Sequence, residues 1–197
     1  MTHLTLIPAP ALRVGSWTDY GELHRVVMGL FHSAELGGQA NERRLSCNIL
    51  FRVDDTSQGK ILLISSDIAP TNLPNGARTK TVPTLAPPAG TPIRFRMAVN
   101  AIRRSRPADP SIKRGKGISP VDGMAEWVSA KLVGAVTEVT VFNHDRSVAT
   151  SGRSPLQIDV VDGYGIVENA AALETLARGG VGRSKAFGCG LLTVARA

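Results

Sequence analysis

The sequence lacks the residues that would support a metal centre, a disulfide framework or a membrane span. Only two of its 197 residues are cysteine, Cys47 and Cys189, and neither lies in a CxxC or Cys/His motif, which argues against structural zinc and disulfide staples. No apolar run approaches the roughly 20 residues that span a bilayer, and the N-terminus has no basic segment followed by a long apolar stretch, as a signal peptide would. We therefore expect a cytoplasmic protein with no membrane contact and two reduced, buried thiols.

Histidine is also scarce. The four copies are His3, His24, His32 and His144, and none belongs to an HExxH motif or a Cys/His cluster. A metal-dependent hydrolase is therefore disfavoured, and we expect neither a metal nor another cofactor. His24 lies beside the apolar stripe of a predicted helix, which would bring it near a domain interface. From spacing alone, a structural or exposed histidine is the better interpretation of His24 than a catalytic one.

Positive charge is abundant and unevenly distributed. The formal net charge is +7, and residues 1–93 contain 8 Lys and Arg against 7 Asp and Glu, whereas residues 94–197 contain 15 against 9. Such a cationic half indicates a polyanionic partner, because each neutralised phosphate releases condensed counterions. The alternative is a basic surface without a binding role, since net charge alone does not define a site.

The densest positive stretch lies between residues 94 and 116, where Asp109 is the single acidic residue. Pro107, Pro110, Gly115 and the adjoining Gly117 make its later part a loop. A strand followed by a cationic loop can track the backbone of a structured RNA through its phosphates and shape; a solvated charged loop is the alternative. The candidate RNA contacts in this basic segment are Arg94, Arg96, Arg103, Arg104, Arg106, Lys113, Arg114 and Lys116.

A proline-rich segment divides the chain into two parts of similar length. Proline lacks a backbone donor and fixes φ, so this segment suits neither a helix nor a central strand. We expect an N-terminal domain over residues 1–81, a linker over residues 82–92 and a C-terminal domain over residues 93–197.

Both parts indicate a ferredoxin-like β-α-β-β-α-β order, so the predicted fold class is α+β with two tandem ferredoxin-like domains. In the first, Glu22 completes a capping box with Asp19, and Pro70 and Pro74 oppose a second helix, so this domain is degenerate. Its predicted elements are the strand Leu4–Ile7, a helix from Asp19 to Phe31, and the strands Leu45–Val53 and Lys60–Ser65. Those of the second domain are the strand Ile93–Ile102, the helix Met124–Val133, the strands Glu138–Phe142 and Leu156–Val161, a helix capped by Asn169 and running to Arg178, and the strand Leu191–Ala195.

A glycine-rich loop, residues 179–190, contains five glycines in twelve positions. Glycine admits positive φ and close backbone approach, so such a loop can point several N–H groups at a phosphate; a tight structural turn is the alternative. It is neither a Walker A loop nor a dinucleotide fingerprint. Because cations flank it, we favour RNA binding, and the candidate contacts are Gly182, Arg183, Lys185 and Gly188.

Three collinear segments resemble one known family. They are Asp19-Tyr-Gly-Glu-Leu-His-Arg-Val-Val-Met-Gly-Leu-Phe31, then Ala98-Val-Asn-Ala-Ile-Arg103 with Glu126-Trp127, and the ending Gly180-Val-Gly-Arg-Ser-Lys-Ala-Phe-Gly-Cys-Gly-Leu-Leu192. Together they are similar to the CasE family, which cuts CRISPR repeat RNA without a metal ion. The resemblance implies two ferredoxin-like domains, cleavage of precursor CRISPR RNA at the base of the repeat hairpin, and retention of the product RNA in the type I-E surveillance complex.

The same resemblance assigns the catalytic role to His24, which matches the family histidine within its motif. Family members often carry a tyrosine three residues before that histidine. Here Gly21 holds that position, and Tyr20, one turn before His24 on the same helical face, is the candidate substitute.

The chemistry needs no metal, because the substrate's own 2′-hydroxyl is the nucleophile. A histidine, with an ordinary pKa of ~6.5, can serve near neutrality as base or acid, and a cation from the basic segment or the glycine-rich loop would stabilise the phosphorane. Two alternatives stay open. One is a catalytically inactive CRISPR-associated subunit that caps the RNA hairpin, and the other is a ferredoxin-like RNA factor unrelated to CRISPR.

Overall fold

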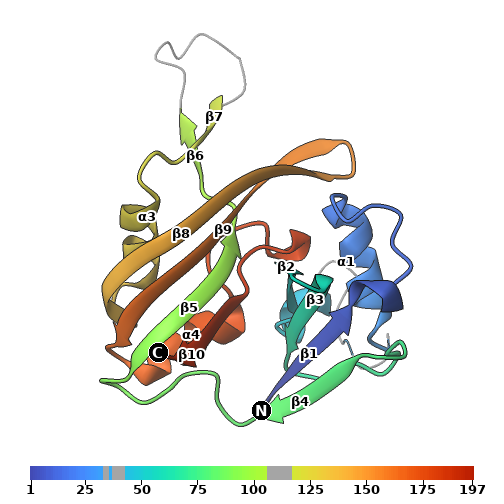
Figure 1. The fold of residues 1–197 in the computed structure, drawn as a ribbon, viewed down its shortest axis with the longest axis horizontal. Helices are drawn as coiled ribbons and strands as arrows, with labels where there is room; N and C mark the ends of the chain where they lie inside the picture. Colours follow the sequence, from blue (N-terminus) through green and yellow to red (C-terminus); the bar gives the residue numbers. More distant parts are fainter. Residues whose placement is uncertain (33–35, 37–42, 106–116) are drawn as a thin grey trace.

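Two four-stranded antiparallel sheets form the framework of the protein (Figure 1). The structure is a computed structural model and describes residues 1–32, 36, 43–105 and 117–197. The strand orders are β2-β3-β1-β4 and β10-β5-β9-β8, and both place the first strand of the unit between its third and fourth, as in a ferredoxin-like domain. The predicted fold class is therefore confirmed. The strands are β1 (Thr2–Pro8), β2 (Leu50–Thr56), β3 (Gly59–Ser66) and β4 (Arg78–Val82) in the N-terminal sheet, and β5 (Pro92–Val99), β8 (Val136–Ser151), β9 (Ser154–Val167) and β10 (Leu192–Arg196) in the C-terminal sheet.

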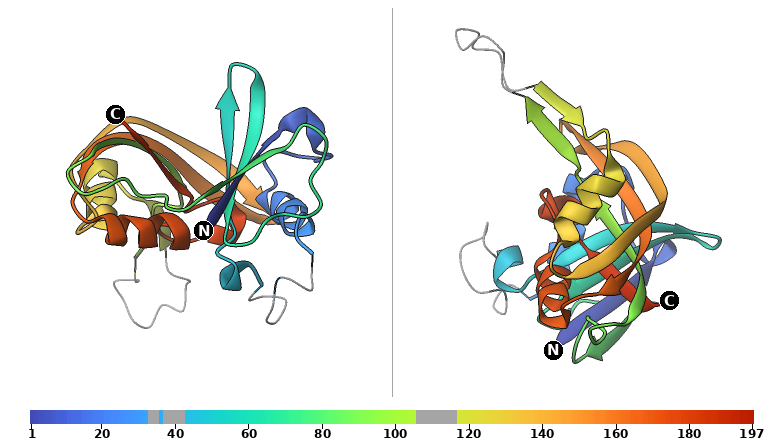
Figure 2. Two further views of the ribbon diagram at one scale, coloured as in Figure 1. Left: turned by 90° about the horizontal axis from the view of Figure 1, so that it is seen from below. Right: turned by 90° about the vertical axis from the view of Figure 1, so that its left-hand side faces the viewer.

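The helices cover one face of each sheet, and Figure 2 shows them on the same side of both. In the N-terminal half, α1 (Tyr20–Gly29) packs Leu23 and Val27 against Ile7 and Phe51. The described residues 67–77, which connect β3 to β4, form turns and no helix. This agrees with the expectation from Pro70 and Pro74 that the first unit is degenerate.

The second predicted strand begins later than its apolar pattern indicated. Arg43–Ser46 forms one helical turn, α2, and the side chain of Leu45 is 62% exposed. Asn48 then adopts a left-handed φ of 46°, so the chain reverses before β2 begins at Leu50. The prediction of a strand from Leu45 was wrong, because this reversal interrupts a continuous run of strand-forming residues.

The capping of α1 was predicted in part. Asp19 Oδ1 accepts hydrogen bonds from the backbone N–H groups of Gly21 at 2.9 Å and Glu22 at 3.3 Å, which satisfies two of the unpaired donors at the start of the helix. The Glu22 carboxylate accepts instead from Gly15 N at 2.7 Å and Ser16 N at 3.1 Å. Glu22 therefore holds the preceding loop, and the reciprocal bond of a capping box was a wrong expectation.

The C-terminal half follows its sequence pattern closely. On β5, Ile93, Phe95, Met97 and Val99 are all buried and face the helices α3 (Met124–Leu132) and α4 (Ala170–Gly179). Asn169 caps α4 by accepting from Ala171 N at 2.9 Å, as predicted. The hairpin β8–β9 is much longer than its two predicted strands. β8 continues past Phe142 to Ser151 through mostly exposed residues that carry no continuous apolar pattern, and β9 continues past Val161 to Val167.

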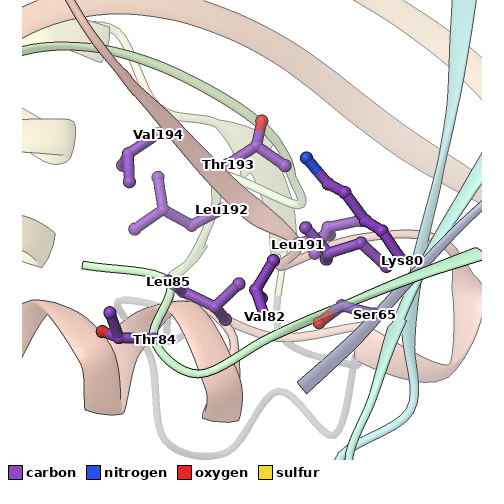
Figure 3. A pocket seen from close by; sticks show the side chains of 10 residues that line it. Ser65, Lys80, Val82, Thr84, Leu85, Leu191, Leu192, Thr193 and Val194 are labelled. Carbon is purple, nitrogen blue, oxygen red and sulfur yellow. The ribbon is translucent and has the colours of Figure 1, made fainter. Parts of the chain in front are cut away.

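The uncovered faces of the two sheets meet across a buried ion pair. Arg52, 3% exposed, donates from Nε to Asp54 Oδ1 at 2.7 Å and from Nη1 to the carbonyl of Arg96 at 2.9 Å. Beside it, side chains from both sheets, among them Lys80 and Leu192, line a cavity of about 170 Å³ (Figure 3). The two sheets are thus held together by polar contacts within an apolar seam.

Several features outside the two sheets complete the fold. The short strands β6 (Ile102–Ser105) and β7 (Gly117–Pro120) pair as a hairpin that projects away from the body (Figure 1). Both cysteines are buried, and burial raises the pKa of Cys189 to about 12, which leaves that thiol protonated and unreactive. Within the described part of the chain, no helix is long and apolar enough to cross a membrane.

Candidate functional site

The helix α1 brings Tyr20 and His24 to one side of the N-terminal half. Because Leu23 and Val27 are buried in the core, the helical period places Tyr20 and His24, four residues apart, on the adjoining face. This face packs against the short 3₁₀ turn Lys185–Phe187 within the glycine-rich loop. The structure therefore brings together the catalytic candidates and part of the predicted RNA-binding loop, which are more than 160 residues apart in the sequence.

The ring of His24 is half-buried against an aromatic edge. Its centroid lies 6.2 Å from that of Phe187, with an angle of 62° between the rings, and its Nδ1 is buried and finds no hydrogen-bond partner among the described residues. Burial, and then the positive charges of Arg44 and Arg25, lowers the pKa of His24 from its ordinary 6.5. The imidazole is therefore neutral at pH 7 and able to accept a proton.

Tyr20 lies in a tighter setting. Its ring stacks on Phe51 with centroids 6.4 Å apart and an interplanar angle of 18°. The pKa of Tyr20 is raised above its ordinary 10.0, chiefly because the side chain is buried, so the phenol stays protonated at neutral pH and its hydroxyl is a hydrogen-bond donor. The position three residues before His24 leaves little room for a side chain, because a Cβ on Gly21 would lie 3.1 Å from the backbone nitrogen of Gly152 in the β8–β9 turn.

The glycine-rich loop depends on left-handed backbone at several positions. Gly182 and Gly188 have φ of 77° and 71°, and Ser184, which is not glycine, has φ of 58°. A Cβ on Gly188 would lie 2.5 Å from Cε1 of Tyr20, whereas one on Gly182 would lie 3.5 Å from the nearest atom of Trp127. Gly188 is therefore required for close packing against Tyr20, while Gly182 and the neighbouring Arg183 are exposed to solvent.

Two cations, Arg44 and Arg25, act on His24 through their charge, and a third, Lys185, lies in the turn that packs against α1. Lys185 is half-buried and donates from Nζ to the carbonyl of Gly179 at 2.7 Å; burial, and then the charge of Arg44, lowers the pKa of Lys185. Arg44 donates from Nη1 to the carbonyl of Ile49 at 3.0 Å, and its charge acts on both His24 and Lys185. A neutral imidazole beside two cations is suited to proton transfer at a phosphate.

The remaining predicted RNA contacts fall into separate groups. Arg94 and Arg96 point from β5 to the uncovered face of the C-terminal sheet, where Arg96 Nη2 donates to Asp162 Oδ2 at 3.0 Å. Arg103 on β6 forms an ion pair with Asp122. Arg104 lies on β6, and the last four candidates, Arg106, Lys113, Arg114 and Lys116, fall outside the described residues.

Two residues of the site were missed in the sequence. Phe187 lies in the glycine-rich loop but was not among its candidate RNA contacts, and Arg44 immediately precedes the predicted strand Leu45–Val53. A helical turn over Arg43–Ser46 would have been the signal for Arg44, but its place near His24 depends on contacts that are distant in sequence. Within the described ranges, no group of three or more His, Cys, Asp or Glu side chains could hold a metal ion.

The similarity of this chain to known proteins extends over its whole length. A family model described as "CRISPR associated protein" matches residues 1–196, and no curated protein sequence matches. The CRISPR-associated protein Cas6e of Escherichia coli K-12 is similar in structure, with a TM-score of 0.70 and 25% identity over 100% of both chains. Cse3 of Thermus thermophilus, bound to an RNA representing a pre-cleavage complex, has the same fold, with a TM-score of 0.69 and 20% identity over 98% of each chain. A chain of a CRISPR RNA-guided surveillance complex has a TM-score of 0.67 and 19% identity over 100% of both.

Proposed function

Because this chain belongs to the family of CRISPR-associated proteins, we propose that it is a metal-independent endoribonuclease that binds the CRISPR repeat hairpin and cleaves precursor CRISPR RNA. The observation that carries the proposal is the position of His24. It is a half-buried imidazole with a depressed pKa, set between the glycine-rich loop and two cations. Structural similarity to Cse3 bound to RNA and to a chain of a surveillance complex supports the same substrate and the same partners for this protein.

In the proposed reaction the 2′-oxygen of the nucleotide before the cut attacks the adjacent phosphorus, and the bond from phosphorus to the 5′-oxygen breaks. Neutral His24 takes the proton of the 2′-hydroxyl as general base. The departing 5′-oxygen receives a proton from a protonated donor, for which Tyr20 is the candidate because its pKa is raised. The products are a 2′,3′-cyclic phosphate and a 5′-hydroxyl, with no net gain or loss of atoms.

The cations supply the electrostatic part of catalysis. The charges of Arg44 and Arg25 act on the imidazole, and Arg44 acts on Lys185 as well, so negative charge developing on the phosphorane would be stabilised without reorganisation. Alignment of the 2′-hydroxyl in line with the leaving oxygen contributes further, because it replaces a bimolecular encounter with an intramolecular one. Arg183 and the cations between Arg103 and Lys116 hold the RNA in place through phosphates.

The assay that tests the proposal is cleavage of the repeat RNA from the host's CRISPR array by purified protein in EDTA. We expect a 5′-hydroxyl product and a cyclic-phosphate product, identified by mass spectrometry, at a rate unaffected by the chelator. Retention of the hairpin product on the protein during gel filtration is expected as well. Cleavage that stops in EDTA would refute the metal-independent mechanism.

A second candidate function is a catalytically inactive subunit that caps the RNA hairpin. It is favoured by the tight position at Gly21, which holds no tyrosine and where a Cβ would press on the β8–β9 turn, and by the packing of Tyr20 between Phe51 and Gly188. Tight binding of repeat RNA with no cleavage over hours, in protein freshly purified and fully folded, would establish this function in place of the nuclease.

A further inference from the structure

Two large aromatic side chains lie in the open on the uncovered face of the C-terminal sheet. Phe142 on β8 is 48% exposed and Tyr164 on β9 is 42% exposed, and their ring centroids are 4.7 Å apart with a tilt of 33°. The guanidinium of Arg94 lies over both rings, 5.9 Å and 5.7 Å from their centroids. We call these three residues the aromatic platform. Its exposure needs an explanation, because folding usually buries such rings.

A β-bulge lies at Phe142 on this face. Val141 pairs with Gly163, and Asn143 pairs with Asp162, so Phe142 is an extra residue with no partner on β9. Bulges of this kind disrupt the regular pairing locally, and they are common beside functional sites. The backbone thus departs from regular pairing at the residue that places a second ring beside Tyr164.

A hollow of about 180 Å³ adjoins the platform. Phe142 and Arg94 form one side, and the polar side is the Asp162 carboxylate, which is held by Arg96 at 2.8 Å and by Asn143 Nδ2 at 3.1 Å. Thr193 and Ala195 of β10 also line the hollow. A concave site with an aromatic wall and a few fixed polar groups suits a flat heterocycle with hydrogen-bonding edges.

The charge around the hollow favours an anionic ligand. Arg94 is exposed and has no ion-pair partner among the residues described, whereas the carboxylate of Asp162 is already paired with Arg96. Arg78 and Lys80 of β4, both exposed, line the adjoining groove together with Thr193. An aromatic wall among unpaired cations is complementary to a nucleotide, whose base stacks and whose phosphate carries negative charge.

We propose that the aromatic platform binds one unpaired nucleotide of an RNA, with its base in the hollow against Phe142 and its phosphate at Arg94. The nucleotide is unpaired, because a base within a duplex does not expose its faces for stacking on a side chain. This inference rests on the proposed role in RNA binding and adds a single-strand subsite to it. The platform acts in binding, and none of its residues belongs to the His24 site.

The test is fluorescence anisotropy at one fixed salt concentration with two labelled RNAs, a single strand of about eight nucleotides and a blunt hairpin without overhang. Phe142→Leu removes the aromatic face but keeps apolar bulk, and Arg94→Gln removes the charge. Val148→Ala is the matched control, because Val148 is an apolar side chain on the same strand that is 73% exposed and lies outside the platform. Circular dichroism establishes that every variant is folded.

We expect Phe142→Leu to weaken binding of the single strand by roughly tenfold, the usual effect of losing one base-stacking contact. Arg94→Gln should weaken it to a similar extent, because a charge-assisted contact to the phosphate is lost. Hairpin binding should stay within twofold of wild type in both variants. Single strands that carry 5-iodouridine should crosslink to peptides containing Phe142 or Tyr164. Unchanged single-strand binding in both folded variants would overturn the proposal and leave the platform to a protein partner. Equal loss for both RNAs would overturn it too, since the platform would then belong to the hairpin site. Failure of the nuclease proposal appears separately, in the EDTA assay with wild-type protein.

Discussion

The imidazole Nε2 of His144 lies 2.9 Å from Oδ1 of Asp159, a carboxylate that is fully buried. The same oxygen accepts from Arg146 Nε at 2.6 Å, and Oδ2 accepts from Gln157 Nε2 at 2.6 Å. Gln157 also donates to the carbonyl of Ala101, and Arg146 to that of Val121. Ala101 and Val121 flank the β6–β7 hairpin, so Asp159 organises the polar contacts that fix the base of the hairpin.

Asp159→Asn should therefore destabilise the protein strongly. The substitution leaves the donors of Arg146 and Gln157 without their charged acceptor in a buried site, which costs about 3 kcal/mol in typical buried ion pairs. Urea unfolding measures the free energy of unfolding. Asp145→Asn is the control, because it removes the same charge from an exposed position of β8, and we expect less than ~0.5 kcal/mol from it. Equal effects of the two substitutions would contradict the role given to Asp159.

The effect of Asp159 should also depend on pH. Burial raises the pKa of Asp159, but hydrogen bonds from Arg146, His144 and Gln157 outweigh burial, so its pKa in the folded protein lies below the ordinary 3.8. A depressed carboxylate contributes stability above its unfolded pKa and loses it as the pH falls through the folded value. The difference in unfolding free energy between wild type and Asp159→Asn should be constant near neutrality and shrink below pH ~4.

His24→Ala should abolish cleavage of repeat RNA and leave binding within a few-fold. A general base typically accelerates a reaction by roughly 10²–10⁴-fold. One neutral imidazole, in contrast, adds little affinity to an interface held by many phosphate contacts. Single-turnover cleavage and anisotropy measure the two effects. His3→Gln is the control, because His3 lies on β1 with its ring bonded to Thr81. Cleavage by His24→Ala at the wild-type rate would remove His24 from the mechanism.

The charge of Arg44 should affect the pH dependence of cleavage. As a base, His24 must be neutral, so the rate should rise with pH and level off above an apparent pKa below 6.5. Arg44→Gln removes a positive charge that disfavours the imidazolium, so the rising limb should move to higher pH, and Arg44→Lys should restore it. A lower maximal rate of cleavage with an unchanged apparent pKa would mean that Arg44 acts on the RNA and not on His24.

Two glycines of the glycine-rich loop, the exposed Gly182 and the buried Gly188, provide a further comparison. Both Gly182 and Gly188 have positive φ, so alanine at either costs about 1 kcal/mol in backbone strain. Only at Gly188 would the new Cβ collide with Tyr20. Gly188→Ala should thus lower the melting temperature more than Gly182→Ala, and slow cleavage by displacing Tyr20. Equal losses of stability would show that the packing against Tyr20 is loose.

Binding of the repeat hairpin should weaken steeply with salt. Each phosphate contact contributes roughly one unit to the slope of log affinity against log salt concentration. Neutralising Lys113, Arg114 and Lys116 one at a time should reduce this slope stepwise, while Lys60→Gln, which removes a charge already paired with Asp55, should not. A slope that is unchanged in all three variants would show that these three residues do not contact the RNA.

Elements with a strong local pattern could be predicted from the sequence. The alternation from Ile93 to Val99 and the Asn169 cap determine their structures almost independently of the rest of the chain. The resemblance of the glycine-rich ending to one family is confirmed by the family match over residues 1–196. The same loop shows the limit of such reasoning, because the contact of Gly188 with Tyr20 unites residues from the two ends of the chain.

Other features depend on tertiary contacts that no local pattern encodes. The reversal at Asn48 places Arg44 near His24, although the residues around it have strand propensity. The distal part of β8 is polar and mostly exposed, and it persists as a strand because β9 pairs with it along its length. The bulge at Phe142 could not be predicted from the sequence either, since a single extra residue does not produce a recognisable pattern of apolar and polar residues.

The turn of the β8–β9 hairpin has a consequence for the integrity of the whole molecule. Thr150 N donates to the carbonyl of Thr18 at 2.8 Å, and Gly152 N lies 3.4 Å from the capping oxygen of Asp19. Arg178 on α4 pairs with Asp67 at 2.8 Å, and Arg52 joins the two sheets between these points. The covalent connection through residues 83–91 is thus one of several attachments. If the chain is cut within that connection, we expect the two fragments to reassemble, because the start of α1 still binds the β8–β9 turn.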